Sequence, residues 1–451
     1  MQTRFDPAVL ATTRGRRADE ILRSCVHCGF CNATCPTYQV RGDELDGPRG
    51  RIYLIKDLLE SPPGASVAVA RTHLDRCLTC RACETTCPSG VRYGELAEIG
   101  REVLEEQAPN RGLLLRLVLS IVPRPRLLRP LVVLGRRFRW LLPRRYRRLL
   151  EPPPRYPRYR DTRRVRDTRR VRDTRDRDTR DRDTRDRDIG DGDTRRGRAS
   201  RRVRDTRDRD TRDRDIGDGD TRRGRALLWQ GCVQRVVTPE VNAHLANLLR
   251  ERGFEPVLAA AEECCGGLAL HLGRTDEARA LMARNVGRLK GLDADVIVSS
   301  ASGCGVTLKD YGRLVDSPEA KSFAERVRDV AEVLADFDFR KRPRNGHEIQ
   351  TVAWHPPCTL QHGQRVTGLT EGLLRKTGYR LVPVADAHLC CGSAGSYSLL
   401  QPKLAGELKA RKAAALMCHS PDVVATANIG CQTHLADAVN VPVLHWLELL
   451  R

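Results

Sequence analysis

Residues 25–36 read CVHCGFCNATCP, and residues 77–88 repeat their C-x2-C-x2-C-x3-C-P spacing as CLTCRACETTCP. Three thiolates at intervals of three residues can each bind one iron of a [4Fe-4S] cluster, and the fourth iron then needs a ligand from elsewhere. In paired runs of this kind, the last cysteine of one run supplies that ligand to the cluster of the other. We therefore expect two neighbouring [4Fe-4S] clusters. Their expected ligands are Cys25, Cys28, Cys31 and Cys87 for the first cluster, and Cys77, Cys80, Cys83 and Cys35 for the second.

Two other uses of cysteine fit this pattern less well. Structural zinc sites usually combine two separated C-x2-4-C pairs, whereas each quartet here is one unbroken run. Disulfide frameworks belong mainly to small secreted domains. This chain has 451 residues, and its first 22 residues lack the apolar segment of a secretory signal. We therefore expect reduced thiols and a cytoplasmic location.

Length and cysteine content both point to several domains with bound cofactors. A chain of 451 residues is long enough for about three domains. Sixteen of its 17 cysteines fall into four sets of four, which favours cofactor binding over scattered use. The remaining cysteine, Cys418, is expected to be a small buried apolar residue.

The residues around the two cysteine runs have helical periodicity. Pro48 can begin a helix in which Ile52 and later apolar residues recur at helical spacing. After the second run, Leu96 and Ile99 begin a similar amphipathic pattern. We therefore expect residues 1–110 to form a helical two-cluster ferredoxin domain, not the compact ferredoxin built from β-hairpins.

Residues 111–159 are expected to form a basic helical linker. Positions 111–150 contain twelve arginines and no acidic residue, and Pro123, Pro125, Pro130 and Pro143 break the apolar pieces between them. No window reaches the roughly 20 apolar residues that span a bilayer. One interpretation is an interfacial segment that contacts anionic lipid or an acidic partner, peripheral on the inner face of the cell membrane. The other, which we favour, is helices packed on the cluster domain with their arginines in solvent.

Residues 160–225 form a low-complexity insertion of DTR and DRD units. They contain 26 arginines and 18 aspartates, so this stretch alone contributes +8 to the net charge of +22. So few apolar residues cannot repay the entropy of folding, and we expect disorder without a catalytic role. A nucleic-acid-binding protein with structural clusters is the remote alternative. It is remote because the aspartates neutralise the arginines and no aromatic residues alternate with them. We expect no nucleic-acid partner.

A second internal repeat carries the remaining paired cysteines. Each half reads as strand, helix, strand, Cys-Cys-Gly, helix, strand, cysteine, and the cysteines of the two halves are offset by 126, 126 and 127 residues. This pattern predicts two tandem α/β domains, at residues 226–345 and 346–451. The cysteines are Cys232, Cys264, Cys265 and Cys304 in the first half, and Cys358, Cys390, Cys391 and Cys431 in the second.

The predicted order of elements brings the four thiols of each half together. Each cysteine follows the carboxyl end of a predicted parallel strand, and right-handed crossovers bring such ends to the same edge of a sheet. Each half therefore has a candidate metal or redox site. The alternative is a dry α/β scaffold with buried cysteines or a redox-active vicinal pair. Four nearby histidines are expected to be hydrogen-bonded packing residues and are not assigned as ligands: His271, His355, His362 and His388.

Tandem Cys…Cys-Cys-Gly…Cys modules behind two C-x2-C-x2-C-x3-C-P runs resemble the iron–sulfur subunits of glycolate oxidase. The wider group includes lactate-utilisation proteins and heterodisulfide reductase. The resemblance covers the chain apart from residues 160–225. The group usually ends each module in C-x-x-C, whereas this chain has ASGC at 301–304 and NIGC at 428–431. Without that fifth cysteine, each half is expected to hold a simpler iron–sulfur cluster or metal, or none, in place of the double-cubane chemistry of heterodisulfide reductase.

The resemblance implies an electron-transfer subunit of an oxidoreductase. FAD-containing partner subunits would oxidise glycolate to glyoxylate, and this chain would pass the electrons towards a quinone. The sequence itself contains no G-x-G-x-x-G dinucleotide fingerprint before a helix, so no catalytic residue is assigned to this chain. A lactate-utilisation or heterodisulfide reductase-type iron–sulfur subunit is the alternative within the same group, and a free-standing reductase is a third.

Overall fold

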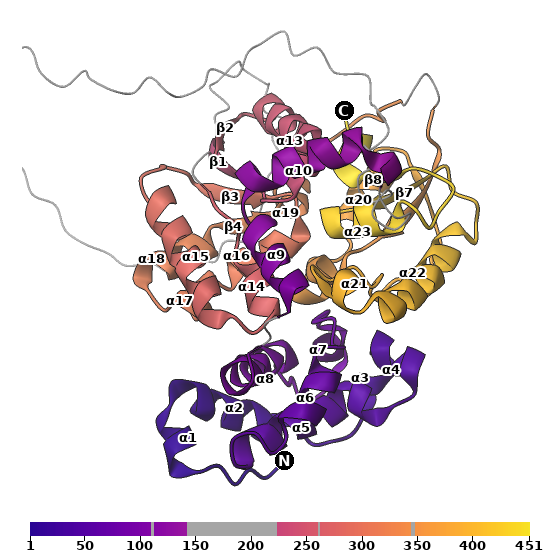
Figure 1. Ribbon diagram of the computed structural model, residues 1–451. Helices are drawn as coiled ribbons and strands as arrows, with labels where there is room; N and C mark the ends of the chain where they lie inside the picture. Colours follow the sequence, from indigo (N-terminus) through magenta and orange to yellow (C-terminus); the bar gives the residue numbers. More distant parts are fainter. Residues whose placement is uncertain (110–111, 142–222, 260–261, 344–347) are drawn as a thin grey trace, which may run out of the picture. The chain divides into compact units, whose positions relative to one another are not determined.

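The computed structural model describes most of the chain and leaves four stretches undescribed. Within the described ranges, no helix combines the length and apolar character that crossing a membrane requires. The described residues belong to one folded unit. They are 1–109, 112–141, 223–259, 262–343 and 348–451 (Figure 1).

Residues 1–109 form a helical domain, as expected, with no strand among them. Pro48 occupies the first turn of α5, whose Ile52 and Ile55 are buried. The predicted second helix is α8, which buries Leu96 and Leu104 in the same core. The helices are α1 (Pro7–Ala11), α2 (Thr13–Ser24), α3 (Phe30–Ala33), α4 (Pro36–Arg41), α5 (Pro48–Glu60), α6 (Val67–Leu74), α7 (Ala82–Thr86) and α8 (Tyr93–Gln107), with a 3-10 turn at Glu44–Asp46.

The basic segment contains two helices, α9 (Leu113–Ile121) and α10 (Pro125–Arg137), and a 3-10 turn at Arg139–Leu141. The expectation that these helices pack on the cluster domain needs correction. Leu115 and Leu119 of α9 join the core of the first α/β domain, and α10 contacts α12 (Gln234–Val237) of that domain. The apolar residues of α9 are covered by the first α/β domain. The sequence pattern shows that α9 has an apolar face but does not show which domain covers it.

Proline also acts differently from expectation in this segment. Pro123 separates the two helices and Pro125 begins α10, as the sequence suggested. Pro130 was expected to break the helix, yet it lies inside α10. An internal proline lacks the N–H donor, so one backbone carbonyl in the preceding turn loses its partner. In a helix on a solvent-exposed surface, water can bind this carbonyl.

The first α/β domain contains a four-stranded parallel sheet in the order β2-β1-β3-β4. Its predicted alternation of strands and helices is confirmed, and β4 is an additional strand. The strands are β1 (Gly224–Trp229), β2 (Phe254–Leu258), β3 (Val296–Ser299) and β4 (Val327–Asp329). Its helices beyond α12 are α13 (Pro239–Glu251), α14 (Gly267–His271), α15 (Thr275–Leu289), α16 (Ser302–Lys309), α17 (Tyr311–Val315), α18 (Pro318–Glu325) and α19 (Val330–Leu334).

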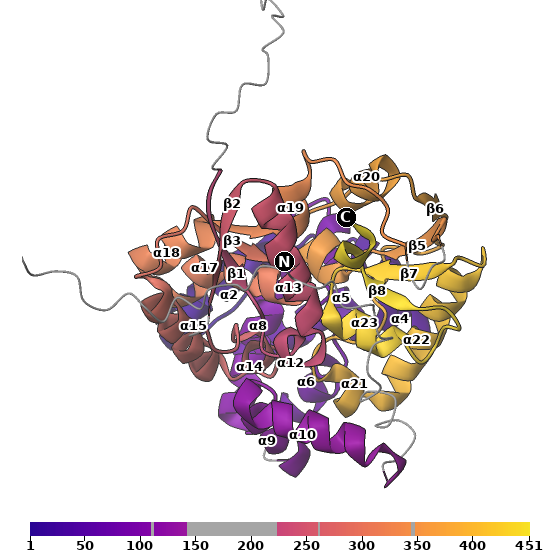
Figure 2. The same cartoon turned by 90° about the horizontal axis from the view of Figure 1, so that it is seen from above.

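The second α/β domain repeats this topology with the parallel order β6-β5-β7-β8, and β7 and β8 lie side by side in yellow in Figure 2. Here β8 is the additional strand. The strands are β5 (Thr351–His355), β6 (Arg380–Val382), β7 (Val423–Thr426) and β8 (Val443–His445). The helices are α20 (Leu369–Lys376), α21 (Tyr397–Leu400), α22 (Pro402–Met417) and α23 (Ile429–Leu435), with a π-helical turn at Thr359–Gly363 and a 3-10 turn at Trp446–Leu449.

The two sheets share one hydrophobic core. Ala226 and Leu228 from β1 belong to the same buried cluster as Val352 and Trp354 from β5. Backbone contacts also join the domains, because the Ser302 N–H donates to the Ala427 carbonyl over 3.0 Å. The repeat therefore folds as a pair of domains that stabilise each other.

The expected start of the first α/β domain was slightly late. Gly224 and Arg225 were assigned to the low-complexity insertion, but they form the beginning of β1 and pair with Phe254 and Glu255. The Arg225 N–H donates to the Asp295 carboxylate over 2.7 Å, and this contact extends the strand beyond its apolar residues. The remainder of the insertion expected at residues 160–225, up to residue 222, lies outside the described residues.

Candidate metal centres

The first cysteine run meets the last cysteine of the second run. Cys25 directly follows α2, Cys28 lies in the next loop, Cys31 is in α3 and Cys87 directly follows α7. All four line one small cavity. Burial, followed by the nearby thiols of Cys25, Cys87 and Cys28, raises the pKa of Cys31 to about 11. These thiols are therefore close enough to interact, as ligands of one cluster must be.

The complementary set lines a neighbouring cavity. Cys35, Cys77, Cys80 and Cys83 border it, together with Tyr93 and other residues. Burial and then the thiols of Cys80, Cys77 and Cys35 raise the pKa of Cys83 well above its ordinary value. A thiol with so high a pKa stays protonated at neutral pH, and it becomes a thiolate when a metal binds the sulfur and displaces the proton.

Both runs use the same backbone geometry to turn their thiols inward. His27 and Thr79, two residues after the first cysteine of each run, have φ values of 56° and 52°. Gly29 and Arg81, which follow the second cysteine of each run, have φ values of 83° and 61°. Left-handed backbone is unfavourable for residues other than glycine, so the surrounding fold has to stabilise three of these four positions.

The sulfur atoms of the second set receive several hydrogen bonds. Cys77 Sγ accepts from the Tyr93 hydroxyl and from the Thr79 N–H, each over 3.4 Å. Cys35 Sγ lies 3.2 Å from Thr37 Oγ1 and 3.9 Å from an Arg51 nitrogen. Such contacts stabilise negative charge on sulfur and raise the reduction potential of a cluster.

A buried charge network lies behind the second set. Arg51 and Asp46 are almost fully buried and lie 3.7 Å apart. Asp46 also accepts from Arg76 over 3.0 Å and contacts His73 over 2.9 Å. Asp46 and His73 approach each other and Asp43 closely enough to suggest a cation site. Because arginines already neutralise the Asp46 carboxylate, we interpret this group as an ion-pair network.

Positive charge from this network reaches the thiols. Burial alone would raise the pKa of Cys77, but the guanidinium groups of Arg51 and Arg101 and the hydrogen bonds from Tyr93 and Thr79 lower it below its ordinary value. The second set thus lies in an electropositive environment. In the first set, Cys87 Sγ accepts from the Val91 N–H over 3.5 Å. Burial raises the pKa of Cys25 there, although a hydrogen bond from the His27 N–H and the N-terminal ammonium group oppose the shift.

The cysteines of the first α/β domain lie at the carboxyl edge of its sheet. Cys232 follows β1, the pair Cys264 and Cys265 follows β2, and Cys304 lies in α16 after β3. The thiols of Cys232, Cys264, Cys265 and Cys304 form a row in which each later thiol affects the pKa of the one before it. The predicted convergence of these four thiols is therefore present in the fold.

The second α/β domain holds a matching row of thiols. Cys358 Sγ and Cys390 Sγ are 3.8 Å apart. The thiols of Cys390 and Cys391 affect each other's pKa, and the Cys431 thiol also affects the pKa of Cys391, whose sulfur atom lies within 4.8 Å of that of Cys431. Lys412, which is buried, lies near these thiols, and its ammonium group donates to the Asp386 carbonyl over 2.6 Å. A buried ammonium group offsets the negative charge that thiolates would bring to this centre.

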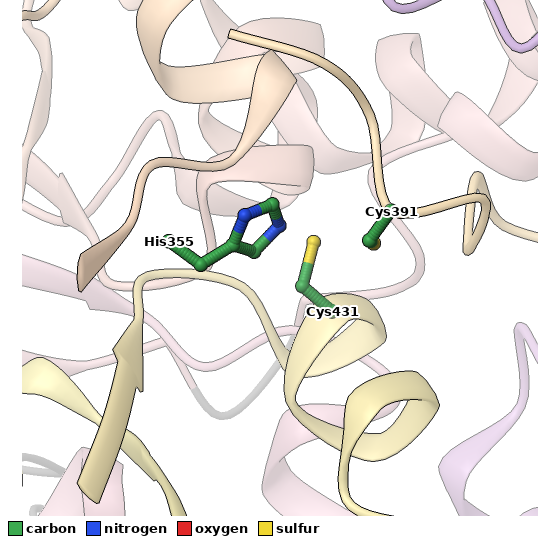
Figure 3. Close-up of side chains that lie close together, drawn as sticks. All are labelled: His355, Cys391 and Cys431. Carbon is green, nitrogen blue, oxygen red and sulfur yellow. The ribbon is translucent and has the colours of Figure 1, made fainter. Parts of the chain in front are cut away.

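One histidine beside this row differs from its expected role. The ligand atoms of His355, Cys391 and Cys431 all lie within 4.8 Å of one another, and all three residues are buried (Figure 3). Both ring nitrogens of His355 lack a hydrogen-bond partner among the described residues. The prediction of a hydrogen-bonded packing residue is therefore wrong for His355. The sequence could have identified His355 as a candidate ligand, because it is the last residue of the strand that precedes Cys358.

The other nearby histidines divide differently. His362 contacts Thr85 Oγ1 and the His388 carbonyl, each over 2.9 Å, so it has the structural role expected of it. His271 is half-buried, and its buried Nδ1 lacks a partner in the described part of the chain. The expectation for Cys418 is also wrong, because this residue is exposed at the end of α22. All seventeen cysteines lie in the described part of the chain, and none of them forms a disulfide.

The helical domain and the second α/β domain bring cysteines together. Cys80, Cys358 and Cys390 belong to one packed group that also contains Leu78 and Tyr397. Burial, followed by the thiol of Cys358, raises the pKa of Cys80 well above its ordinary value. Only an intact fold creates this neighbourhood, since 278 residues separate Cys80 from Cys358 in the sequence.

A cavity of about 200 Å³ lies beside the second cysteine set. Cys77 and Arg101 border it from the helical domain, and Leu115 borders it from α9. His271 and Tyr397 contribute from the two α/β domains. Its lining is partly apolar and partly polar.

Comparisons with known families agree with this architecture. Residues 21–91 match the family described as "4Fe-4S dicluster domain", and residues 226–309 and 352–436 match "Cysteine-rich domain". The fold and sites therefore define an iron–sulfur protein with one dicluster domain and two cysteine-rich domains. The dicluster domain carries two [4Fe-4S] clusters, and the cysteine-rich domains provide further candidate cluster sites.

Full-length relatives narrow this class. The chain is 37% identical to the "Glycolate oxidase iron-sulfur subunit" of Escherichia coli (strain K12), with 100% of this chain and 98% of the relative covered. It therefore belongs to the family of glycolate oxidase iron–sulfur subunits, which are electron-transfer proteins. It is also 28% identical to the "Probable glycolate oxidase iron-sulfur subunit" of Bacillus subtilis (strain 168), over 91% of this chain and 87% of the relative.

Similarity to the alternative group is partial. The "Lactate utilization protein A" of Exiguobacterium sp. (strain ATCC BAA-1283 / AT1b) is 22% identical over 49% of this chain and 95% of its own length. Such proteins match only about half of the present chain.

Proposed function

We propose that this chain is the electron-transfer subunit of a flavin-dependent complex that oxidises glycolate to glyoxylate. FAD-containing partner subunits perform the oxidation, and this chain passes the electrons towards a membrane quinone. The proposal is supported by similarity over the full length to a glycolate oxidase subunit. Iron–sulfur clusters suit this task because each accepts one electron, whereas a reduced flavin delivers two.

We assign the cluster ligands as the spacing predicts. Cys25, Cys28, Cys31 and Cys87 would hold one [4Fe-4S] cluster, and Cys35, Cys77, Cys80 and Cys83 the other. This assignment is supported by the two cavities that these sets line and by the interactions among their thiols. The donors fit the group, because a cluster needs four thiolates and each set offers four.

The observation that carries the proposal is the packed group formed by Cys80, Cys358 and Cys390. Electrons tunnel efficiently only between cofactors that are close, so a chain with several clusters functions as a relay only when their ligands approach one another. Cys80 belongs to the second cluster set and Cys358 to the second cysteine-rich domain. We infer a route from the first cluster to the second, and then to a centre held by Cys358, Cys390, Cys391 and Cys431.

The direction of this route follows from the surroundings of the two cluster sets. Arg51, Arg101 and Tyr93 surround the second set with positive charge and hydrogen-bond donors. Both effects raise a reduction potential. The second cluster would therefore have the higher potential and take electrons from the first.

Contact with a membrane is supported by the surface of α10. Three apolar residues of α10 and the residue that follows the helix recur at helical spacing and are exposed, and we call them the α10 stripe: Leu127, Leu131, Leu134 and Phe138. Exposed arginines flank the stripe, among them Arg126 and Arg129. An apolar stripe flanked by arginines matches the interface of an anionic membrane. The cavity beside Cys77 extends to Leu115 of the adjoining α9, so a quinone could approach the second cluster from this side.

The proposal can be tested on the anaerobically purified complex of this chain with its FAD-containing subunits. We expect glycolate to reduce the complex and to produce the EPR signals of reduced [4Fe-4S] clusters. Iron analysis should find more iron than two clusters require, and the surplus should disappear in the Cys264→Ser/Cys390→Ser variant. Reduction by lactate but not by glycolate would favour the lactate-utilisation alternative. A colourless protein containing zinc would overturn the proposal.

A further inference from the structure

His355 occupies the position of a metal ligand in the second cysteine-rich domain. It ends β5, three residues before Cys358, and Figure 3 shows its ring directed towards the sulfur of Cys431. Cys431 lies in the first turn of α23, and Cys391 lies in the loop that precedes α21. Three buried donor atoms from three separate elements thus converge within 4.8 Å.

The imidazole of His355 has no other bonding role in the described structure. Both of its ring nitrogens are buried and lack hydrogen-bond partners. A buried nitrogen without a partner loses its interaction with water and gains nothing in return, so such groups are uncommon in folded proteins. The buried His445 provides the contrast, because its Nε2 lies 2.9 Å from the Ser300 carbonyl. A metal bond to one nitrogen of His355 would remove most of this cost.

The internal repeat shows that this nitrogen donor is specific to the second domain. The offset of 126 residues that relates Cys358 to Cys232 also relates His355 to Trp229. Trp229 ends β1 as His355 ends β5, and both are buried. An indole N–H cannot bind a metal, so the first domain offers four thiols where the second offers four thiols and an imidazole.

We propose that His355 is a nitrogen ligand of the metal centre in the second cysteine-rich domain. It acts there with thiolates from the row Cys358, Cys390, Cys391 and Cys431, whereas the centre of the first domain is bound by thiolates alone. This inference depends on the proposed metal binding by these domains. An iron–sulfur cluster is the class of metal centre that suits the remaining donors.

Binding of the neutral imidazole of His355 in place of one of the four thiolates would have a functional consequence. It removes one negative charge from the ligand set, which raises the reduction potential of an iron–sulfur centre. The buried ammonium group of Lys412 acts in the same direction. The second-domain centre would therefore accept electrons from the neighbouring cluster set through Cys80 and Cys358.

The test uses the full chain, purified without air and reduced until the centre is paramagnetic. We expect pulsed EPR to detect a strongly coupled ¹⁴N nucleus, and we expect ¹⁵N-histidine labelling of the unaltered chain to convert it into a ¹⁵N coupling. Labelling needs no substitution, so this readout does not depend on a variant that folds.

Two substitutions then locate the nitrogen. His355→Cys should keep the iron content, lose the coupling and shift the midpoint potential of this centre to lower values. His362→Asn, at a histidine that already has hydrogen-bond partners, should retain the coupling. A coupling that is absent from the unaltered chain, or that persists in His355→Cys, would overturn the assignment of His355. A second domain that contains no metal at all would instead overturn the metal binding on which the inference depends.

Discussion

Cys80 in the dicluster domain and Cys358 in the second cysteine-rich domain belong to one packed group of side chains, and burial followed by the Cys358 thiol raises the pKa of Cys80. The corresponding cysteine of the first cysteine-rich domain, Cys232, belongs to a different core that contains no cysteine of the dicluster domain. The two cysteine-rich domains are therefore equivalent in fold but not in their position relative to the clusters.

This asymmetry predicts a magnetic interaction on one side only. When both centres are reduced, the EPR signal of the second [4Fe-4S] cluster should be broadened by the centre of the second cysteine-rich domain. Cys390→Ser/Cys391→Ser should remove the broadening, because it dismantles the adjacent centre. The matched control, Cys264→Ser/Cys265→Ser, should leave it unchanged. Equal effects of the two variants would contradict the inferred route.

The Tyr93 hydroxyl should set part of the potential of the second cluster. Tyr93→Phe removes one hydrogen bond to Cys77 Sγ and keeps the ring that packs in the core. A hydrogen bond with a net value of about 1 kcal/mol corresponds to about 40 mV for one electron, so we expect the potential to fall by this amount. Redox titration followed by EPR measures the shift.

Tyr53→Phe is the control for this measurement. Tyr53 is exposed on α5 of the same domain, so its variant should leave the potential unchanged. A Tyr93→Phe protein with an unaltered second-cluster potential would show that the Tyr93 hydrogen bond does not set this potential.

Membrane contact predicts a change at Trp140. The chain has four tryptophans, of which Trp140 is 66% exposed and the other three are buried. Vesicles rich in phosphatidylglycerol should shift its fluorescence emission to shorter wavelength, and neutral vesicles should do so less. The shift should weaken with added salt, because screening reduces the attraction between arginines and anionic lipid.

Substitution of arginines beside the α10 stripe should weaken this binding. Each arginine near an anionic surface contributes about 1 kcal/mol, so Arg126→Gln/Arg129→Gln should lower vesicle affinity by about 30-fold. Arg375→Gln/Lys403→Gln changes the net charge equally at exposed positions of the second cysteine-rich domain and should have little effect. An equal loss in both variants would show that binding depends on overall charge and not on this surface.

Asp329 should make the stability of the first cysteine-rich domain fall as pH rises. Burial raises the pKa of this carboxyl to about 7, while the hydrogen bond from the Ala331 N–H opposes the shift. The folded state then binds more protons than the unfolded state between pH values of about 4 and 7. The free energy of unfolding therefore falls as the pH rises through this range. Asp329→Asn keeps a hydrogen-bond acceptor and does not titrate. The difference between the melting temperature of the variant and that of the unaltered protein should therefore grow in favour of the variant from pH 5 to pH 8.

Asp422 provides a control of opposite sign. Hydrogen bonds from the Thr351 and Gln350 N–H groups lower the pKa of Asp422, so it remains ionised throughout the same pH range. Asp422→Asn should lower the melting temperature by a constant amount from pH 5 to pH 8. A constant difference for Asp329→Asn as well would show that Asp329 does not titrate in this range.

Several features of this protein followed from local sequence patterns. Proline and apolar spacing predicted α5 and α8, since both depend on residues within a few turns of one another. The tandem repeat predicted two parallel sheets, because cysteines and strands recur at nearly constant offsets. Local patterns gave wrong predictions for Pro130, which lies inside a helix, and for Cys418, which is exposed. Both outcomes depend on exposure to solvent, which a local pattern does not report.

The sequence alone determined the class of protein, since cysteine spacing within each run encodes cluster chemistry over a dozen residues. Only the tertiary structure brought Cys80 to Cys358 and left His355 with two unpartnered nitrogens beside Cys391 and Cys431. Both outcomes depend on how separate domains and strands pack. Contacts between residues that are far apart in the chain form because the whole fold buries apolar surface. Residue spacing within a short stretch therefore cannot predict which distant residues become neighbours.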